Sequence, residues 1–233
     1  PEYLIDINDL HGELGYVEVT PTQARLGAMA RHAEVLASAD LLRAAPIFAD
    51  AEWVIADPVV RNRGTVGGSL CQADPAEDLS TVCEILDATV LVRGPKGPRE
   101  IGIDDFHVGP YETARDYNEI LIEVRIPLRP HSSSAYSKVE RRVGDWAVAA
   151  AGAAVTLDGD RIVSGRVGLT AVNADHDGLA AVREALAGAP ATEETFAEAG
   201  RLAALACEPV TDQRGTEAYK RHLASELTIR TLR

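Results

Sequence analysis

Short apolar-rich runs, some of them alternating apolar with polar residues, recur along the first half of the chain and predict strands. They occupy residues 3–7, 16–20, 24–29, 89–94 and 119–127, and the last run ends at a proline. Residues 99–106 predict a strand leading into a loop. Apolar positions at helical spacing predict helices over 30–38 and 41–56, with a break or a first turn at Pro46 in the second.

A stretch rich in proline and serine at residues 127–134 predicts a boundary between two parts of the chain. A long apolar run at 146–158 is closed by a turn at Asp158-Gly159-Asp160, and residues 161–172 are its expected partner strand. Helices are predicted over 176–188, 192–208 and 216–233. Antiparallel strands mixed with helices predict an α+β fold in two modules, residues 1–130 and 131–233.

A helix start is predicted just after residue 73. Asp74 fits the N-cap, Pro75 the first helical position and Glu77 the third, which predicts a helix over 75–88. Capping accounts for Asp74 and Glu77, whereas Asp78 is not needed for the cap and is available for another role.

Composition narrows the classes of function. The 233 residues are 46% hydrophobic, enough for one large domain or two small ones, and no run is long enough to span a bilayer. A net charge of −13 disfavours a nucleic-acid partner. The three cysteines are widely spaced and form no CxxC pair, which disfavours a cluster or zinc site on this chain and favours a reducing cytoplasm. The histidines show no metal-binding spacing.

The sequence RNRGTVGGSL at residues 61–70 is the main chemical candidate. Adjacent glycines at 67 and 68 could expose consecutive N–H groups to an anion, or they could simply form a tight turn. Arg61 and Arg63 could add positive potential or be solvated. The segment is neither a Walker A loop nor a dinucleotide-binding GxGxxG. A phosphate loop followed by a hydroxyl acceptor at Asp78 points to a nucleotide or a flavin.

The segment DPVVRNRGTVGGSLCQADPAEDL (57–79) closely resembles the FAD-binding medium subunits of molybdenum hydroxylases. This is the family of aerobic carbon monoxide dehydrogenase and, more distantly, of the xanthine dehydrogenase flavin domain. The resemblance extends to LIDI, LGAMARHAEV, NEILIEVRIP, AYSKVERRVGDWAVAAAGAAVTLDGDRI and EAYKRHLASELTIRTL, in the family's order over nearly the whole chain. It implies a flavin-binding subdomain of the PCMH or vanillyl-alcohol-oxidase type, followed by a small antiparallel sheet with helices.

The resemblance also implies site residues. Those that match the loop around the FAD pyrophosphate are Thr65, Val66, Gly67, Gly68 and Ser69. Asp78 matches the acidic residue at the ribityl chain, and Lys138 matches a lysine beside the flavin. Ile55, Leu121 and Trp146 match positions near the isoalloxazine, although core packing is an alternative for Leu121 and Trp146. No catalytic acid or base and no metal ligand is implied on this chain.

The implied function is electron transfer within a complex. FAD on this chain would take electrons from [2Fe-2S] clusters on a small subunit and pass them to an external acceptor. A large subunit would carry the molybdenum cofactor, in a dimer of heterotrimers.

Alternatives remain at the level of the sequence. The family has an upstream AGG-x-S loop that this chain lacks, so we expect a truncated chain, consistent with Pro1, and weakened FAD binding. A flavin-free scaffold that docks partner subunits is the competing hypothesis. A self-sufficient flavin oxidase is a third, disfavoured because no substrate site is evident.

Overall fold

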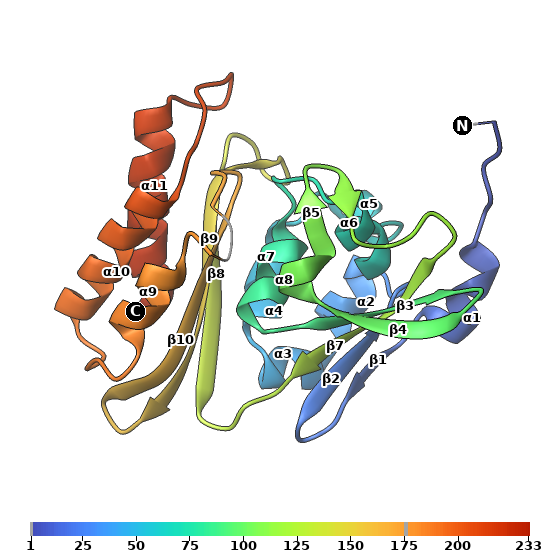
Figure 1. The fold of residues 1–233 in the computed structure, drawn as a ribbon, viewed down its shortest axis with the longest axis horizontal. Helices are drawn as coiled ribbons and strands as arrows, with labels where there is room; N and C mark the ends of the chain where they lie inside the picture. Colours follow the sequence, from blue (N-terminus) through green and yellow to red (C-terminus); the bar gives the residue numbers. More distant parts are fainter. Residues whose placement is uncertain (1, 175–176) are drawn as a thin grey trace.

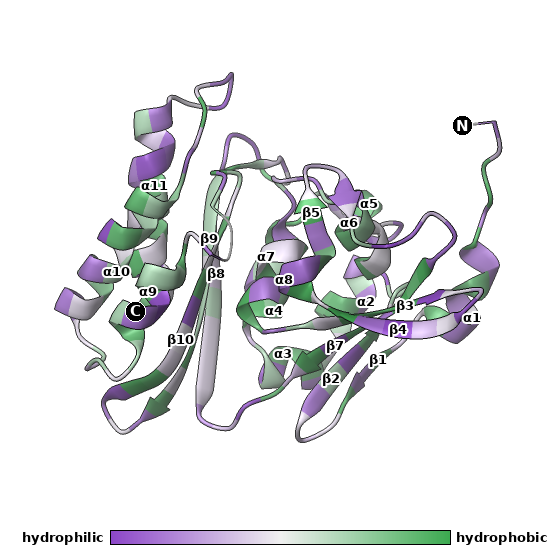
Figure 2. Cartoon of the chain, in the orientation of Figure 1, coloured by the Kyte–Doolittle hydropathy of each residue, from purple (hydrophilic) through white to green (hydrophobic). Residues whose placement is uncertain are grey.

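The computed structural model describes residues 2–174 and 177–233 and shows two layered units joined side by side (Figure 1). The first contains a five-stranded antiparallel sheet in the order β1-β2-β7-β3-β4. Its strands are β1 (Val17–Val19), β2 (Gln23–Gly27), β7 (Ile120–Pro127), β3 (Thr89–Gly94) and β4 (Gly97–Gly102). The edge strand β4 is mostly hydrophilic (Figure 2), as expected for a strand with one unpaired side.

One face of this sheet supports the helices that later form the site. They are α2 (His32–Ala37), α3 (Ala39–Ala44), α4 (Ile47–Val54), α5 (Pro58–Arg61), α6 (Val66–Gln72), α7 (Asp78–Ile85) and α8 (Ile103–Phe106). Apart from those of α5, the apolar side chains of these helices and of β2, β3 and β7 form one core cluster. Smaller elements complete the unit: η1 (Asn8–Leu10), α1 (His11–Leu14), β5 (His107–Gly109) and β6 (Glu112–Thr113).

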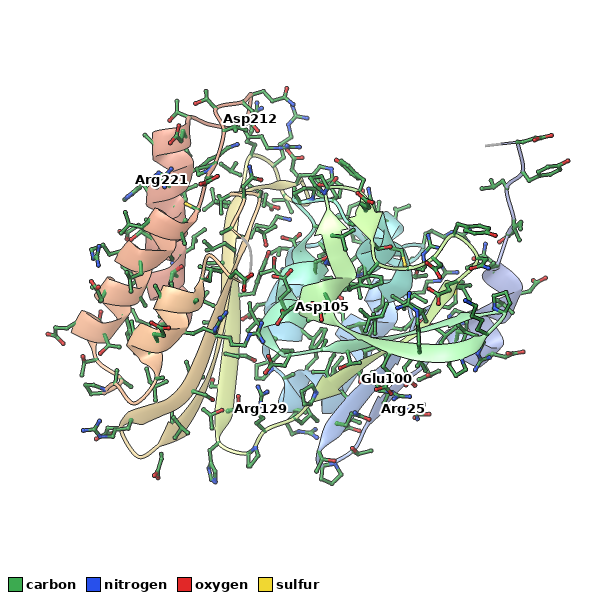
Figure 3. All side chains as sticks on the ribbon, viewed as in Figure 1. Arg25, Glu100, Asp105, Arg129, Asp212 and Arg221 are labelled. Atoms are coloured by element: carbon green, nitrogen blue, oxygen red, sulfur yellow. The ribbon has the colours of Figure 1, made fainter. Side chains whose placement is uncertain are left out.

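The opposite face of the sheet is charged. Arg25 bonds to Glu18 at 2.8 Å across β1 and β2, and Arg125 pairs with Glu100 and Glu123 across β4 and β7. Figure 3 labels Arg25 and Glu100 on this face. Only one side of the sheet is therefore apolar, which explains the alternating pattern of its strands.

The second unit is a three-stranded antiparallel sheet, order β10-β9-β8, with three helices on one face (Figure 1). Its elements are β8 (Ser132–Glu140), β9 (Ala147–Asp158), β10 (Arg161–Thr170), α9 (Ala180–Leu186), α10 (Glu193–Ala206) and α11 (Glu217–Leu232). The other face of this sheet packs on the first unit. In β9, Ala150 and Ala154 join the first core, whereas Ala149 and Ala151 join the core under the helices. Burial of both faces explains the unbroken apolar run.

Most predicted elements are present. The helical region 41–56 is broken into α3 and α4 at Ala45 and Pro46, as the proline predicts. The hairpin of 146–158 with 161–172 is confirmed as β9 and β10, and 192–208 and 216–233 are confirmed as α10 and α11. Residue 176, at the start of the helix predicted over 176–188, lies outside the described residues; the helix there is α9.

Three expectations are wrong. Residues 3–7 form no strand, and Tyr3, Leu4 and Ile5 are exposed, because no described strand pairs with them. Residues 65–69 are not a loop, since Thr65 caps α6 and the glycines lie in its first turn. The helix predicted from 75 begins at Asp78.

The reason for the later start of α7 is local. The Asp74 carboxylate accepts a hydrogen bond from the Ala76 N–H and makes only a turn. Glu77 is the residue that caps the helix, accepting from the N–H groups of Leu79 and Ser80.

Among the helices of the described ranges, 2–174 and 177–233, none combines the length and apolar character needed to cross a bilayer.

Candidate functional site

A pocket of about 550 Å³ lies where the two units meet. Its walls come from the N-terminal segment at Ile7 and Asn8, from α2, from the segment that runs from the end of α4 through α6, and from the start of α7, β8 and the loop before β9. The predicted site residues that line it are Ile55, Thr65, Gly68, Ser69, Asp78, Lys138 and Trp146. The fold therefore gathers seven of the ten residues around one cavity from five separate stretches of sequence.

The other three predicted residues lie in the core. Val66 and Leu121 belong to the apolar cluster of the first unit, with 0% and 3% exposure. A Cβ on Gly67 would lie 2.8 Å from the Cβ of Ala28, so this glycine lets α6 approach the end of β2. These three residues are buried and do not line the pocket.

The backbone N–H groups at the start of α6 are already bonded. Those of Val66 and Gly67 donate to the carbonyls of Ala30 and Ala28, at 3.0 and 2.8 Å. The Gly68 N–H donates to the Thr65 hydroxyl oxygen at 3.1 Å, and the Ser69 N–H to the Thr65 carbonyl at 3.0 Å. The expected nest of free N–H groups is therefore wrong. The residues of this segment that line the pocket are Thr65, Gly68 and Ser69.

Asp78 and Lys138 form a buried ion pair on the pocket wall. The Lys138 Nζ lies 2.8 Å from Asp78 Oδ2, and the side chains are 2% and 5% exposed. Lys138 also donates to the Val54 carbonyl, and Tyr136 donates to Asp78 Oδ1 at 2.7 Å. Burial raises the pKa of Asp78, and the charge and hydrogen bond of Lys138 partly offset that rise. Asp78 and Lys138, the two charged residues predicted for the site, are thus each other's main partner.

Glu77 adds a second buried carboxyl to this wall. Burial raises its pKa to about 6, although the hydrogen bonds from Ser80 and from the Leu79 N–H oppose the rise. Arg61 points to the backbone, donating to the carbonyls of Ile55 and Ala56 at 2.8 and 2.9 Å. Of the two sequence candidates for positive potential, Arg63 is exposed and lines the pocket.

Sequence reasoning missed a buried histidine in the same wall. His32 Nδ1 lies 2.9 Å from Glu52 Oε2, and its Nε2 lies 2.9 Å from the Ser69 hydroxyl oxygen. His32 is 2% exposed and Glu52 is fully buried. Both residues sit within helical segments assigned to packing. A polar residue on an apolar helix face was the available signal, but the sequence does not reveal that two such residues meet.

The rim of the pocket is apolar. Trp146 is 38% exposed at the end of the loop that follows Gly144. Gly144 has φ +79°, and a Cβ there would lie 2.7 Å from the Ala56 carbonyl oxygen, so this glycine lets the loop close against the turn after α4. With Ile55 and Val60, Trp146 forms an apolar surface beside the polar wall.

A second hollow, of about 530 Å³, lies between the start of α7 and the second unit. Its walls carry the carboxyl groups of Asp74, Glu77, Glu84 and Glu208, and it contains none of the predicted site residues. Such a lining is unfavourable for a ligand that bears phosphates.

Comparisons with known proteins agree over the whole chain. The family described as the FAD binding domain in molybdopterin dehydrogenase matches residues 1–129, and the carbon monoxide dehydrogenase flavoprotein C-terminal domain matches residues 134–233. The carbon monoxide dehydrogenase medium chain of Hydrogenophaga pseudoflava is 33% identical over 233 residues, covering 100% of this chain and 81% of that protein.

Solved structures show the same likeness. A carbon monoxide dehydrogenase from Hydrogenophaga pseudoflava that lacks the Mo-pyranopterin moiety matches with a TM-score of 0.92 and 34% identity, over 100% of this chain and 81% of that chain. Quinoline 2-oxidoreductase from Pseudomonas putida 86 matches with a TM-score of 0.87 and 30% identity, over 95% of this chain and 77% of that chain.

Proposed function

Since the chain belongs to the family of FAD-binding medium subunits of molybdenum hydroxylases, we propose that it carries electrons through a bound FAD within an oxidoreductase complex. In this proposal the electrons come from [2Fe-2S] clusters on a small subunit and leave to an external acceptor. The single observation that supports it most strongly is the convergence of seven predicted FAD contacts on one pocket.

The residues of the pocket fit such a cofactor. Bound FAD supplies a ring that accepts and releases electrons; the protein supplies its position and surroundings. We propose that the hydroxyls of Thr65 and Ser69 and the bare surface of Gly68 hold the pyrophosphate. Trp146 and Ile55 offer the apolar surface that a flavin ring needs. The buried Asp78–Lys138 pair would orient the polar part between them, with Lys138 toward the flavin and Asp78 toward the ribityl chain.

Val66, Gly67 and Leu121 hold these groups in place from the core rather than from the cavity. Val66 and Gly67 fix the start of α6, whose first turn carries the pocket hydroxyls. We therefore propose an indirect role for these three residues in the FAD site.

We propose the division of labour in the complex from the two matched families. Residues 1–130 carry most of the pocket, and residues 131–233 contribute Lys138 and Trp146 and offer the outer helices for docking. The partners would be a large subunit with the molybdenum cofactor and a small iron–sulfur subunit, arranged as a dimer of heterotrimers. The widely spaced free thiols of Cys71, Cys83 and Cys207 favour a reducing compartment such as the cytoplasm.

The first experiment measures flavin directly. We expect the purified chain to bind added FAD, seen as a visible flavin spectrum after gel filtration. Gly68→Val should abolish this binding, because Gly68 is exposed on the pocket wall and a Cβ there meets only the Thr65 hydroxyl. Gly12→Val is the matched control, since nothing lies within 4 Å of a Cβ at that exposed helical glycine.

Two results would contradict the proposal. If the folded wild-type chain binds no FAD, the flavin-free scaffold hypothesis is favoured instead. If Gly68→Val binds FAD as well as the control does, the cofactor lies elsewhere.

A further inference from the structure

Ser69, His32 and Glu52 form a continuous hydrogen-bonded line from the pocket into the core. The two links, Ser69 Oγ to His32 Nε2 and His32 Nδ1 to Glu52 Oε2, are both 2.9 Å long. Ser69 lines the pocket, while His32 and Glu52 are buried. The line therefore connects a buried titratable pair to a hydroxyl that a ligand can touch.

The imidazole ring is held in this position. The His32 N–H donates to the Gly64 carbonyl at 3.2 Å, and a Cβ on Gly64 would lie 2.9 Å from His32 Cδ2. Gly64 thus packs against the ring edge, so both ring nitrogens stay directed at their partners.

The number of protons that the His32–Glu52 pair holds determines whether His32 Nε2 donates or accepts a hydrogen bond. With one proton shared between Nδ1 and Oε2, the pair is either imidazolium with carboxylate or neutral imidazole with carboxylic acid. In both forms Nε2 carries hydrogen. Glu52 Oε1 is buried and bonds to none of the described residues, which disfavours a bare carboxylate and favours keeping the shared proton.

We propose that the His32–Glu52 pair is a positioning unit that sets the direction of the Ser69 hydroxyl, and with it the affinity of the pocket for a phosphate-bearing ligand. While the pair holds its proton, Nε2–H donates to Ser69 Oγ. The Ser69 hydrogen is then available to a phosphate oxygen. The proposal rests on the proposed FAD function and names a residue pair that sets the affinity of the pocket for FAD.

Loss of the shared proton reverses the bond. Neutral His32 then keeps its hydrogen on Nδ1, facing the Glu52 carboxylate, and Nε2 becomes an acceptor. Ser69 donates to Nε2 and turns a lone pair toward the pocket, which repels a phosphate oxygen. This matters because the nearby backbone N–H groups of Gly68 and Ser69 are already bonded within α6.

The surroundings favour the protonated pair. Burial by itself lowers the pKa of His32, but the hydrogen bond and charge of Glu52 outweigh it and raise the pKa above its usual range. Burial raises the pKa of Glu52. Of the other groups facing the pair, Glu77 raises the pKa of His32, Asp78 raises that of Glu52, and Arg61 lowers both. Lys138 shares the pocket wall but is neutralised by Asp78.

The order of the three residues is also that of a hydrolase triad. A hydrolase additionally needs free backbone N–H donors beside the serine to hold an oxyanion. The N–H groups of Gly68 and Ser69 are bonded to Thr65, so the arrangement suits a positioning role.

The first test compares FAD with riboflavin, which lacks phosphates. We expect the FAD affinity of the wild-type chain to fall about tenfold as the pH rises through the pKa of the pair, the value of one hydrogen bond to a charged group. Riboflavin affinity should not follow this titration. Ser69→Ala should bind FAD about tenfold more weakly at neutral pH and show no such pH dependence.

Two further variants distinguish a positioning role of the His32–Glu52 pair from a purely structural one. Glu52→Gln removes the group that loses the shared proton, and the new amide N–H can donate to Nδ1 and keep the hydrogen on Nε2, so we expect FAD affinity to stay high at alkaline pH. His32→Gln should also make the affinity independent of pH. His222→Gln, at an exposed histidine on α11, is the control and should titrate as the wild type does.

The second test needs no flavin and no variant. Nitrogen-15 NMR of the histidine side chains in the wild-type chain should show a hydrogen on His32 Nε2 at neutral pH, lost only as the pH rises through the pKa of the pair. An unprotonated Nε2 at neutral pH would overturn the proposal, as would a pH dependence of FAD binding that persists in Ser69→Ala. If the chain binds no flavin at all, the proposed function fails, and the NMR result still decides the state of the pair.

Discussion

At the scale of single residues, the polar groups around Asp78 bond to one another before any ligand binds. Lys138 neutralises Asp78, Tyr136 donates to the same carboxyl, and Thr170 links Tyr136 to Thr81 through hydrogen bonds of 2.8 and 2.7 Å. A satisfied buried network is rigid, whereas one left with a single unpaired member is costly. The pocket wall is therefore preorganised.

Removal of Lys138 tests this view. Lys138→Met leaves the Asp78 carboxyl buried without its cation, and we expect the free energy of unfolding to fall by about 3 kcal/mol. Adding Asp78→Asn to the same chain should restore a large part of the loss. Denaturant titration at neutral pH measures both, and Lys96→Met, at an exposed turn residue, is the control. Equal stability of Lys138→Met and the control would show that the pair contributes nothing.

At the scale of elements, the contact between α6 and β2 positions the pocket hydroxyls. Thr65 caps α6 with its own hydroxyl, and the N–H groups of Val66 and Gly67 bond to the segment that follows β2. The helix is short, so these bonds and the close approach at Gly67 hold it, rather than intrinsic helix propensity. The glycine pair thus has two separate purposes: Gly67 serves packing and Gly68 faces the cavity.

Gly67→Ala tests the packing role. A Cβ there would lie 2.8 Å from Ala28 Cβ and 2.9 Å from the Ala28 carbonyl oxygen, so α6 must move away from β2. We expect a loss of about 1–3 kcal/mol in stability. Thermal unfolding beside Gly12→Ala measures the effect; an unchanged melting temperature would mean that α6 accommodates the methyl group without cost.

At the scale of the whole molecule, the sheet β8–β10 is a shared wall between the two units. Glycine and alanine on its strands let α7 lie close to it: a Cβ at Gly168 would be 2.8 Å from Thr81 Cγ2, and one at Gly152 would be 2.6 Å from Ile85 Cδ1. Because Lys138 and Trp146 reach the pocket from the second unit, any shift of this wall opens the site.

Gly168→Val should therefore affect both stability and the pocket. We expect a loss of more than about 2 kcal/mol, with FAD binding weakened because α7, which begins at Asp78, is pushed away from the sheet that carries Lys138. Gly102→Val is the matched control, since only Asp105 Oδ2 comes within 4 Å of a Cβ at that exposed position. Calorimetry measures the stability of both variants, and flavin titration measures their FAD affinity. If Gly168→Val is destabilised but binds FAD with full affinity, the packing of α7 on this sheet does not control the site.

The sequence by itself determined the order and type of most elements, since periodicity and turn residues act locally. Pro46 marked the break between α3 and α4, and the apolar run at 146–158 marked β9. The resemblance to the flavin-binding family, confirmed by the matched domains, rested on contiguous motifs that the sequence displays directly. The same motifs supplied the ten predicted site residues, and the fold brings seven of them to one pocket.

Tertiary structure alone decided which polar groups pair. Asp78 with Lys138, and His32 with both Glu52 and Ser69, join residues distant in sequence, and hydrogen-bond partners at such separations leave no local pattern. It also decided that the glycines at 67 and 68 begin a helix, because the carbonyls of Ala28 and Ala30 take the N–H groups that a loop would have left free. The exposure of residues 3–5 was decided in the same way, since a strand needs a partner strand to pair with.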